Sequence, residues 1–495
     1  MGINPLKFNI MRKLHPILEY LFELLVNSLE DLVAYLDPNK HRLKGAFMPE
    51  RKILSKRNKG FNINGKSISP KLSIQGVLVN GETGSGKTVN VVIRSILTVF
   101  GSQIIHDPSK ELFFKTSGAL LKKLYRILQL DFSSPQSSLR FNPMFRAITK
   151  SQITQLATNL VTIGTDERDA DSFWNTKAIE VLYVLISILK TQEIQYQTLT
   201  NVAYLLDVLQ SKDSKTLVDH LFAKYADEEL FVKYTSISSQ SANTFSSIVS
   251  TAQSAVQIFA LDENIAEITS SDTIGDFDTI RNELTTLYLH SSTAKMRYYS
   301  NITSIFLSQY FENFFEELPT PEMKDVYFHL DETPILSIGS LDIIASNIRK
   351  YRGALMCVCQ NSQSQLTAKY GRRAEAVISN LRTKVYLSAD LQTATALERT
   401  IGKYEFIDKK DNDKLKNRSV LTADEIMSLP TNRALILVSG MRSIYARLKP
   451  YYMVKELREL AELPPYMNEI PVVSQKIQLL PLEEMFPNAF ADETD

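Results

Sequence analysis

Eight consecutive residues have the types and the spacing that bind phosphate. They form a complete G-x-x-x-x-G-K-[ST] loop: Gly81, Glu82, Thr83, Gly84, Ser85, Gly86, Lys87 and Thr88. Glycines at these positions let successive backbone N–H groups turn toward an anion without Cβ clashes. We expect Lys87 to reach the β- and γ-phosphates of a nucleotide and Thr88 to hold Mg²⁺. The sequence therefore predicts a nucleoside triphosphate site.

The residues around this phosphate loop (residues 81–88) predict the elements that position it. Residues 76–80 form a short apolar run typical of a buried strand, and after the loop apolar residues recur at helical spacing up to Phe100. Because a helix begins there, its positive dipole end faces the bound phosphates. No N-K-x-D motif for reading guanine occurs in the sequence, which favours ATP over GTP.

Further apolar runs alternate with helical patterns along the chain. This alternation predicts an α/β fold with a parallel sheet covered by helices on both faces. The strands that we expect after the first one lie at residues 103–107, 126–131, 284–289, 326–332, 354–360, 384–388 and 434–439.

Two acids end the predicted strand at 326–332 and supply what the phosphate loop lacks. We expect Asp331 to hold Mg²⁺ through its water shell and Glu332 to polarise the attacking water. The adjacent predicted strand ends at Gln360, whose amide could sense the γ-phosphate and report hydrolysis. The alternative for Gln360 is a polar strand cap.

Between residues 151 and 268 the apolar pattern is helical only, with helices expected at 173–189, 199–209, 216–225 and 236–259. We interpret this region as an all-α domain inserted into the α/β domain, with Trp174 as a core anchor. We therefore expect an N-terminal amphipathic helix and basic linker at residues 1–72. A nucleotide-binding domain follows in two parts, at 73–150 and 276–463, on either side of the all-α insertion at 151–275. An extended acidic tail is expected at 464–495.

The overall composition and net charge do not indicate which kind of partner the protein binds. Among 495 residues, 44% are hydrophobic and 22% charged, with a net charge of +1, so any DNA surface must be local. Residues 40–71 carry ten Lys or Arg against Glu50 alone, and residues 345–385 carry eight against Glu375 alone. Each run is either a solvated face or a surface for a polyanion.

Two further features bear on the compartment. Cys357 and Cys359 lie in an apolar run, which favours reduced core thiols in the cytosol over a metal site, since the histidines form no ligand-spaced pair. Residues 17–36 are apolar but contain four acids. Acids at the centre of a bilayer are costly, so we expect an amphipathic helix there and no transmembrane helix in this chain.

Besides the phosphate loop, a series of motifs follows in a fixed order along the chain, at residues 107–112, 141–143, 173–174, 271–281, 330–332, 360–371 and 421–426. In this order they resemble a known family, the type IV secretion coupling proteins (TraG/TraD-type conjugation ATPases). The likeness covers roughly residues 70–455, and the Gln-rich motif from Gln360 to Leu366 is its most specific piece.

The resemblance implies a RecA-like P-loop domain with an inserted all-α domain, assembled as a hexamer. It also implies ATP turnover that moves DNA, or a DNA-bound relaxase, through a secretion channel at the inner membrane. The chain would then be cytoplasmic and peripheral to that membrane. Many members of the family carry N-terminal transmembrane helices, so a chain without them would either dock on a separate membrane partner or belong to a soluble subgroup. Arginines that resemble the family's edge-facing ones could reach a neighbour's nucleotide in trans, with Arg382 preferred over Arg352, Arg372 and Arg373.

One departure concerns the segment from Asp107 to Glu111. The family's usual D-P-K-G-E is D-P-S-K-E here, which leaves a nucleotide contact of this segment open. Two alternative functions also remain. One is an FtsK/HerA-like translocase that segregates or packages DNA, and the other is a recruitment platform that binds nucleotide without hydrolysing it. The intact Lys87, Thr88, Asp331 and Glu332 argue against the platform.

Overall fold

The computed structural model divides the chain into two compact units. The larger consists of residues 47–394 and 424–495, and the smaller of residues 1–46 and 395–423. Within them the structure describes residues 45–163, 172–211, 214–408, 414–467, 477–487 and 489. The helix expected at 17–36 lies outside the described residues. Among the described helices, none has the length and apolar character needed to cross a membrane.

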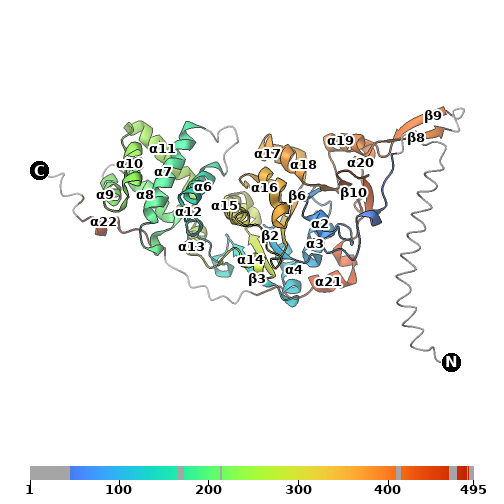
Figure 1. Ribbon diagram of the computed structural model, residues 1–495, viewed down its shortest axis with the longest axis horizontal. Helices are drawn as coiled ribbons and strands as arrows, with labels where there is room; N and C mark the ends of the chain where they lie inside the picture. Colours follow the sequence, from blue (N-terminus) through green and yellow to red (C-terminus); the bar gives the residue numbers. More distant parts are fainter. Residues whose placement is uncertain are drawn as a thin grey trace, which may run out of the picture. The chain divides into compact units, whose positions relative to one another are not determined.

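A nine-stranded sheet forms the centre of the larger unit (Figure 1). The strand order is β11-β10-β7-β1-β6-β5-β2-β4-β3, and the strands from β7 to β3 run parallel while β10 and β11 are antiparallel additions. All eight predicted strands are present and β11 is additional. The bounds are β1 Val77–Asn80, β2 Ser102–Asp107, β3 Arg126–Asp131, β4 Thr285–His290, β5 Val326–Leu330, β6 Gly353–Cys359, β7 Thr383–Tyr386, β10 Arg433–Val438 and β11 Ile444–Arg447.

Both faces of the sheet are buried, because alternate side chains of each strand enter different hydrophobic cores. On β1, Val77 and Val79 belong to one core and Leu78 to the other. The first core is covered by α2 Pro70–Ser73, α3 Ile93–Thr98, α4 Glu111–Lys122 and α21 Lys455–Ala461. The second is covered by α15 Met296–Phe314, α16 Leu341–Asn347, α17 Ser362–Tyr370 and α18 Arg373–Asn380. Cys357 and Cys359 are buried free thiols of the second core.

Between β3 and β4, the residues that the structure describes form helices and short connections. Several of them begin at a polar residue whose side chain accepts a hydrogen bond from a first-turn backbone N–H, and Thr149 with Gln152 forms a complete capping box. The main helices are α6 Lys150–Thr162, α7 Phe173–Leu189, α8 Leu199–Gln210, α9 Lys215–Tyr225, α10 Glu228–Ser238, α11 Ala242–Val256, α12 Ile258–Leu261 and α13 Glu263–Ile268. The single helix expected at 236–259 is wrong, since Ser241 caps a new helix there.

The expectation that Trp174 anchors the core is also wrong. Trp174 keeps 43% of its surface exposed and Phe173 keeps 57%. Both residues occupy the first turn of α7, where their rings pack edge to face on each other at 5.2 Å. The core-facing positions of this end of α7 are taken by Asn175 and Ala178 instead.

The described part of the predicted basic linker is folded. Three of its residues, Phe61, Ile63 and Ile68, are fully buried in the first core, which also contains residues of α3 and α4. The backbones of Ser55 and Ser67 form an antiparallel β-bridge. In the smaller unit, β8 Lys403–Asp408 pairs antiparallel with β9 Lys414–Ser419, a hairpin that the sequence did not predict. Within the predicted acidic tail, Leu480 and α22 Leu482–Met485 pack on the helical region, where Leu480 N–H donates to Asn201 Oδ1 at 2.9 Å.

Candidate nucleotide-binding site

The phosphate loop joins the carboxyl end of β1 to a helix, as its sequence predicts. Gly84 and Gly86 adopt φ values of +80° and +85°, a left-handed region that favours glycine. A Cβ on Gly86 would lie 2.5 Å from Nδ2 of Asn90, so a side chain here would also displace the Asn90 amide, which donates to the Gly86 carbonyl at 3.0 Å. After Lys87 the chain enters the π-helical turn η2 Thr88–Val92, which continues into α3. The loop therefore has the backbone that can direct N–H groups toward an anion.

Lys87 and the neighbouring strands hold the loop in place. The Lys87 side chain is buried, and its ammonium donates to the carbonyls of Gly81 at 2.6 Å and Glu82 at 3.1 Å. From β6, the Cys359 carbonyl accepts from Gly81 N–H at 3.2 Å. Beyond β7, Ser388 Oγ accepts from Glu82 N–H at 2.7 Å. The sequence predicted a strand ending at Ser388 but not its contact with the loop, because only the sheet order brings the two together.

Asp331 lies directly after β5, two strands from the phosphate loop. Its pKa is raised to about 7, mainly by burial and also by the negative charges of Glu332 and Asp107, while the positive charge of Lys87 opposes the rise. Next to it on β2, burial lowers the pKa of His106 to about 4, so this imidazole is neutral. Its Nδ1 lies 2.5 Å from the Asp331 carbonyl oxygen, which can only accept, so Nδ1 donates. His106 thus fixes the Asp331–Glu332 peptide from the neighbouring strand.

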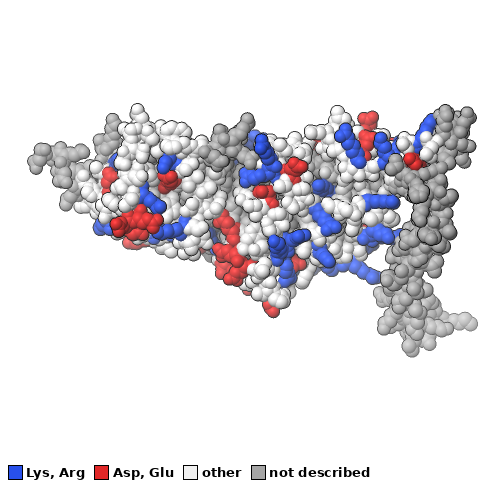
Figure 2. Space-filling view, turned by 45° about the horizontal axis from the view of Figure 1, so that its top comes forward, with Lys and Arg blue, Asp and Glu red and all other residues white. Residues whose placement is uncertain are grey.

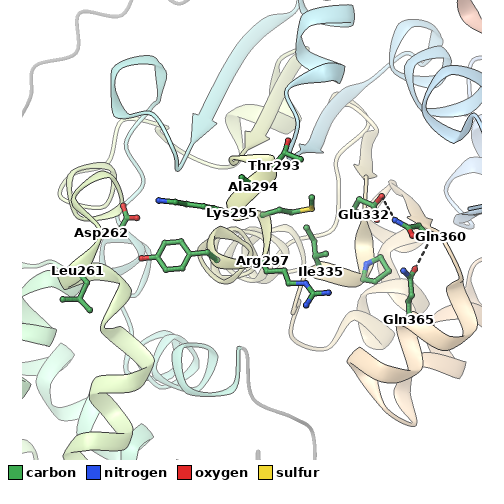
Figure 3. A pocket seen from close by; sticks show the side chains of 13 residues that line it. Leu261, Asp262, Thr293, Ala294, Lys295, Arg297, Glu332, Ile335, Gln360 and Gln365 are labelled. Atoms are coloured by element: carbon green, nitrogen blue, oxygen red, sulfur yellow. Dashed lines mark hydrogen bonds between the residues drawn. The ribbon is translucent and has the colours of Figure 1, made fainter. Parts of the chain in front are cut away.

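Glu332 and Gln360 are brought together at the same edge of the sheet (Figure 3). Glu332 has a left-handed backbone, with φ of +51°, and Gln360 Nε2 donates to its Oε1 at 3.4 Å. Gln365 Oε1 accepts from the backbone N–H groups of Gln360 at 3.0 Å and Asn361 at 3.1 Å. A left-handed non-glycine residue is strained and is frequent at functional sites. The Gln-rich motif therefore fixes the chain that orients Glu332.

The segment from Asp107 to Glu111 contacts the end of β3. Lys110 forms an ion pair with Asp131 at the end of β3. Asp107 accepts from Phe113 N–H at 2.8 Å, and burial raises its pKa to about 7. The lysine of the D-P-S-K-E segment, Lys110, therefore binds the carboxylate at the end of β3. Asp107 lies close enough to Asp331 to raise the pKa of Asp331.

The residues at this edge fit a nucleotide with Mg²⁺. The buried carboxyl groups Asp331 and Asp107 have pKa values raised mainly by burial, and a bound cation beside them would favour their ionised forms. Among the described residues, no three or more His, Cys, Asp or Glu side chains form a ready metal cage. Mg²⁺ usually takes only one or two protein carboxylates and completes its shell with phosphate and water, so this donor set suits it.

A cavity of about 760 Å³ adjoins the phosphate loop at Gly84, Ser85 and Gly86. Its lining combines residues of the loop with residues far away in the sequence: Asn64, Lys66, Asn432, Arg447, Tyr452 and Met453. The buried Arg94 connects the segment before β1 to the segment after β11, because it donates to Asn62 Oδ1 at 3.3 Å and to the Lys449 carbonyl. This cavity was not predictable from sequence patterns because its walls come from both ends of the chain.

Two of the four arginines considered for a role in trans lie away from the carboxyl-terminal edge of the sheet, where the phosphate loop is found. Arg382 precedes β7 at the opposite, amino-terminal edge of the sheet, where its Nη1 donates to Gln75 Oε1 at 2.7 Å. Arg352 also lies at that edge and pairs with Asp325 at 2.7 Å. Arg372 lies between α17 and α18 and Arg373 begins α18, and both are exposed. A role of Arg382 toward a neighbouring subunit stays a prediction.

Comparison with known proteins identifies the family. The model of the family described as type IV secretory system conjugative DNA transfer matches residues 27–476. The chain belongs to this family. Protein VirD4 of Rhizobium radiobacter is 25% identical over 439 residues, which cover 81% of this chain and 61% of that protein. VirD4 of Agrobacterium fabrum is 25% identical over 445 residues, which cover 81% and 63%. The chain thus spans about three fifths of these curated relatives.

Solved structures of conjugative coupling proteins have the same fold. The bacterial conjugative coupling protein TrwBdeltaN70 has a TM-score of 0.67 at 16% identity, covering 83% of this chain and 95% of that one. The plasmid coupling protein TrwB in complex with ADP and Mg²⁺ has a TM-score of 0.65 at 16% identity, covering 88% and 98%. The predicted fold class is therefore confirmed: a RecA-like parallel sheet with an inserted helical region.

Proposed function

We propose that this chain is an ATP-hydrolysing coupling protein that drives the transfer of DNA, or of a DNA-bound relaxase, through a type IV secretion channel. The observation that carries the proposal is the meeting of Lys87, Asp331 and Glu332 at one sheet edge in a chain of the conjugative DNA transfer family. A phosphate-binding ammonium, a buried aspartate and a strained glutamate are the groups that phosphoryl transfer to water needs.

In this proposal each group has one task. The backbone N–H groups of residues 81–88 and the Lys87 ammonium bind the β- and γ-phosphates. Thr88 and Asp331 hold Mg²⁺, which neutralises developing negative charge on the phosphates when it is bound. Glu332 accepts a proton from the attacking water, and Gln360 keeps the Glu332 carboxylate oriented. The complex of TrwB with ADP and Mg²⁺ supports these cofactors for this chain.

The cavity of about 760 Å³ supports a place for the nucleoside. It adjoins Gly84 and Gly86 of the loop and offers Tyr452 and Met453 as apolar surface for a base, with Asn64 and Asn432 as hydrogen-bonding side chains. A volume in this range is typical of small-molecule sites. We assign the base and ribose of ATP to this cavity.

The proposal extends to assembly and location. We propose a homohexamer in which an arginine of one subunit reaches the nucleotide of the next, located in the cytoplasm at the inner membrane against channel components. On the face drawn in Figure 2, most Lys and Arg side chains lie over the sheet part of the larger unit and few over its helical part. A basic surface over the ATPase part is suited to a nucleic acid partner.

Conjugation assays test the coupling function against segregation. In a donor strain that lacks this gene, wild-type protein should restore plasmid transfer, and Lys87→Ala should lower transfer by several orders of magnitude because the phosphates lose their main side-chain cation. Plasmid retention without recipients should be equal in all strains. Normal transfer with impaired retention would favour the FtsK/HerA-like alternative, and full transfer with Lys87→Ala would contradict a role for ATP.

A further inference from the structure

A second cavity, of about 920 Å³, opens beside Glu332 on the side away from the phosphate loop. Its walls follow the carboxyl ends of β4, β5 and β6, and no residue of the phosphate loop lines it. Figure 3 shows Lys295 and Arg297 rising from the segment after β4, with Glu332, Gln360 and Gln365 on the facing wall. The nucleotide site assigned above does not use Lys295 or Arg297.

Four charged side chains line this cavity, namely Lys295, Arg297, Asp262 and Glu332. Lys295 and Arg297 are exposed, and within the described ranges neither forms an ion pair with an acid. Both acids already accept hydrogen bonds within the subunit. Asp262 accepts from Ile265 N–H at 3.0 Å and from Tyr299 Oη at 3.3 Å, and Glu332 accepts from Gln360 Nε2 at 3.4 Å. The two cations therefore remain available to phosphate oxygens from outside the subunit.

The form of the cavity favours a strand over a single small anion. In Figure 3 the two basic side chains diverge, Lys295 toward Asp262 and Arg297 toward Ile335, so they can contact different phosphates. Tyr298, which lies next to Arg297, keeps 42% of its surface exposed and also lines the cavity. An aromatic ring beside phosphate-binding cations can stack an unpaired base, which a duplex does not offer.

We propose that this cavity binds the backbone of a single DNA strand, with Lys295 and Arg297 on phosphates and Tyr298 stacked on a base. The proposal rests on the function proposed above and identifies the surface where the transferred strand meets the ATPase. The strand then lies against Gln360 and Gln365, which orient Glu332. Binding of the strand is therefore coupled to the hydrolytic site, and DNA should stimulate ATP hydrolysis through this contact.

Binding of a fluorescent single-stranded oligonucleotide to the assembled full chain tests this proposal. Replacing both cations, Lys295→Gln with Arg297→Gln, removes two phosphate contacts. The plot of log affinity against log salt should then become less steep by roughly 1.4, since each contact to a single strand contributes about 0.7. Separately, Tyr298→Ala should weaken binding by about 5- to 150-fold at fixed salt, the usual contribution of one stacked base. Both variants should lose most of the stimulation of ATP hydrolysis by DNA.

A matched control uses the opposite edge of the sheet. Lys122 ends α4 and Arg126 begins β3, and both are exposed. The pair Lys122→Gln with Arg126→Gln removes the same charges and should leave the salt slope within about 0.3 of the wild type. The charge-preserving exchange Lys295→Arg with Arg297→Lys should retain most of the binding, which separates lost charge from misfolding.

The outcomes distinguish this inference from the proposed function. Wild-type protein that binds no single strand at low salt would end the proposed DNA transfer itself. Wild-type binding with an unchanged slope and affinity in the Lys295/Arg297 and Tyr298 variants would overturn the cavity assignment alone. Equal losses in the control pair would show a diffuse charge effect and also overturn it. A loss of the hexamer in the cavity variants, measured by sedimentation, would identify the cavity as a subunit contact instead.

Discussion

At the residue scale, Gly86 carries the strictest backbone requirement of the phosphate loop. Alanine in a left-handed conformation costs about 1 kcal/mol in strain alone, and at Gly86 its Cβ would also meet the Asn90 amide at 2.5 Å. We expect Gly86→Ala to lower Tm by several degrees and to weaken nucleotide binding at least tenfold, because the loop must shift. Calorimetry and a fluorescent ATP analogue measure the two effects.

Gly440 provides the control for this prediction. Its φ is +82°, yet a Cβ there would meet nothing within 4 Å. Gly440→Ala should therefore show the strain without the clash, with a smaller loss of Tm and unchanged nucleotide affinity. Equal effects of the two substitutions would mean that the space around Gly86 does not matter.

Single residues differ in how far the sequence predicts their place. Lys87 and Thr88 belong to one contiguous motif, whose loop and following helical turn form locally. The strand before Asp331 and Glu332 was predictable from its apolar run, but the bond from His106 was not, because the pairing of β2 with β5 creates it. Trp174 was placed wrongly because a helix start can leave an aromatic residue outside the core.

At the element scale, the folded segment before β1 presents a basic surface. Lys56, Arg57 and Lys59 are exposed there, while Phe61 nearby is fully buried. If this surface binds DNA, replacing the three residues by Glu should flatten the salt dependence of binding, by about 0.7 for each phosphate of a single strand that is no longer neutralised. Fluorescence anisotropy between roughly 50 and 200 mM salt, where the affinity of such surfaces falls steeply, provides the measurement. An unchanged slope would make this segment a solvated face.

Elements that depend on local apolar runs were predictable, and elements that depend on pairing were not. The strands of the parallel sheet are buried on both faces and read as apolar runs. The strand β9 Lys414–Ser419 has one apolar residue among lysines and arginine, so its sequence resembles a loop. Likewise, the 760 Å³ cavity joins Asn64 to Tyr452 across the sequence, and only the folded chain reveals it.

At the scale of the whole molecule, we predict that activity requires a ring. An arginine supplied in trans contributes on the order of 10³–10⁵ to turnover, so a monomer should be nearly inactive. Mixtures of Lys87→Ala subunits with Arg382→Ala subunits should regain activity, because some interfaces combine an intact loop with an intact arginine. Parallel mixtures with Arg372→Ala test the exposed alternative. Specific activity that is independent of concentration in a monomeric particle would contradict the trans arginine.

The proposed mechanism depends above all on Glu332 acting as the base of ATP hydrolysis next to a bound nucleotide. The decisive experiment compares ATP affinity and steady-state hydrolysis of wild-type protein and Glu332→Gln, with Lys87→Ala as the variant that should not bind. We predict that Glu332→Gln binds ATP as the wild type does and turns over about 10²–10⁴-fold more slowly, the usual contribution of a positioned base. Hydrolysis by Glu332→Gln at the wild-type rate would contradict this mechanism.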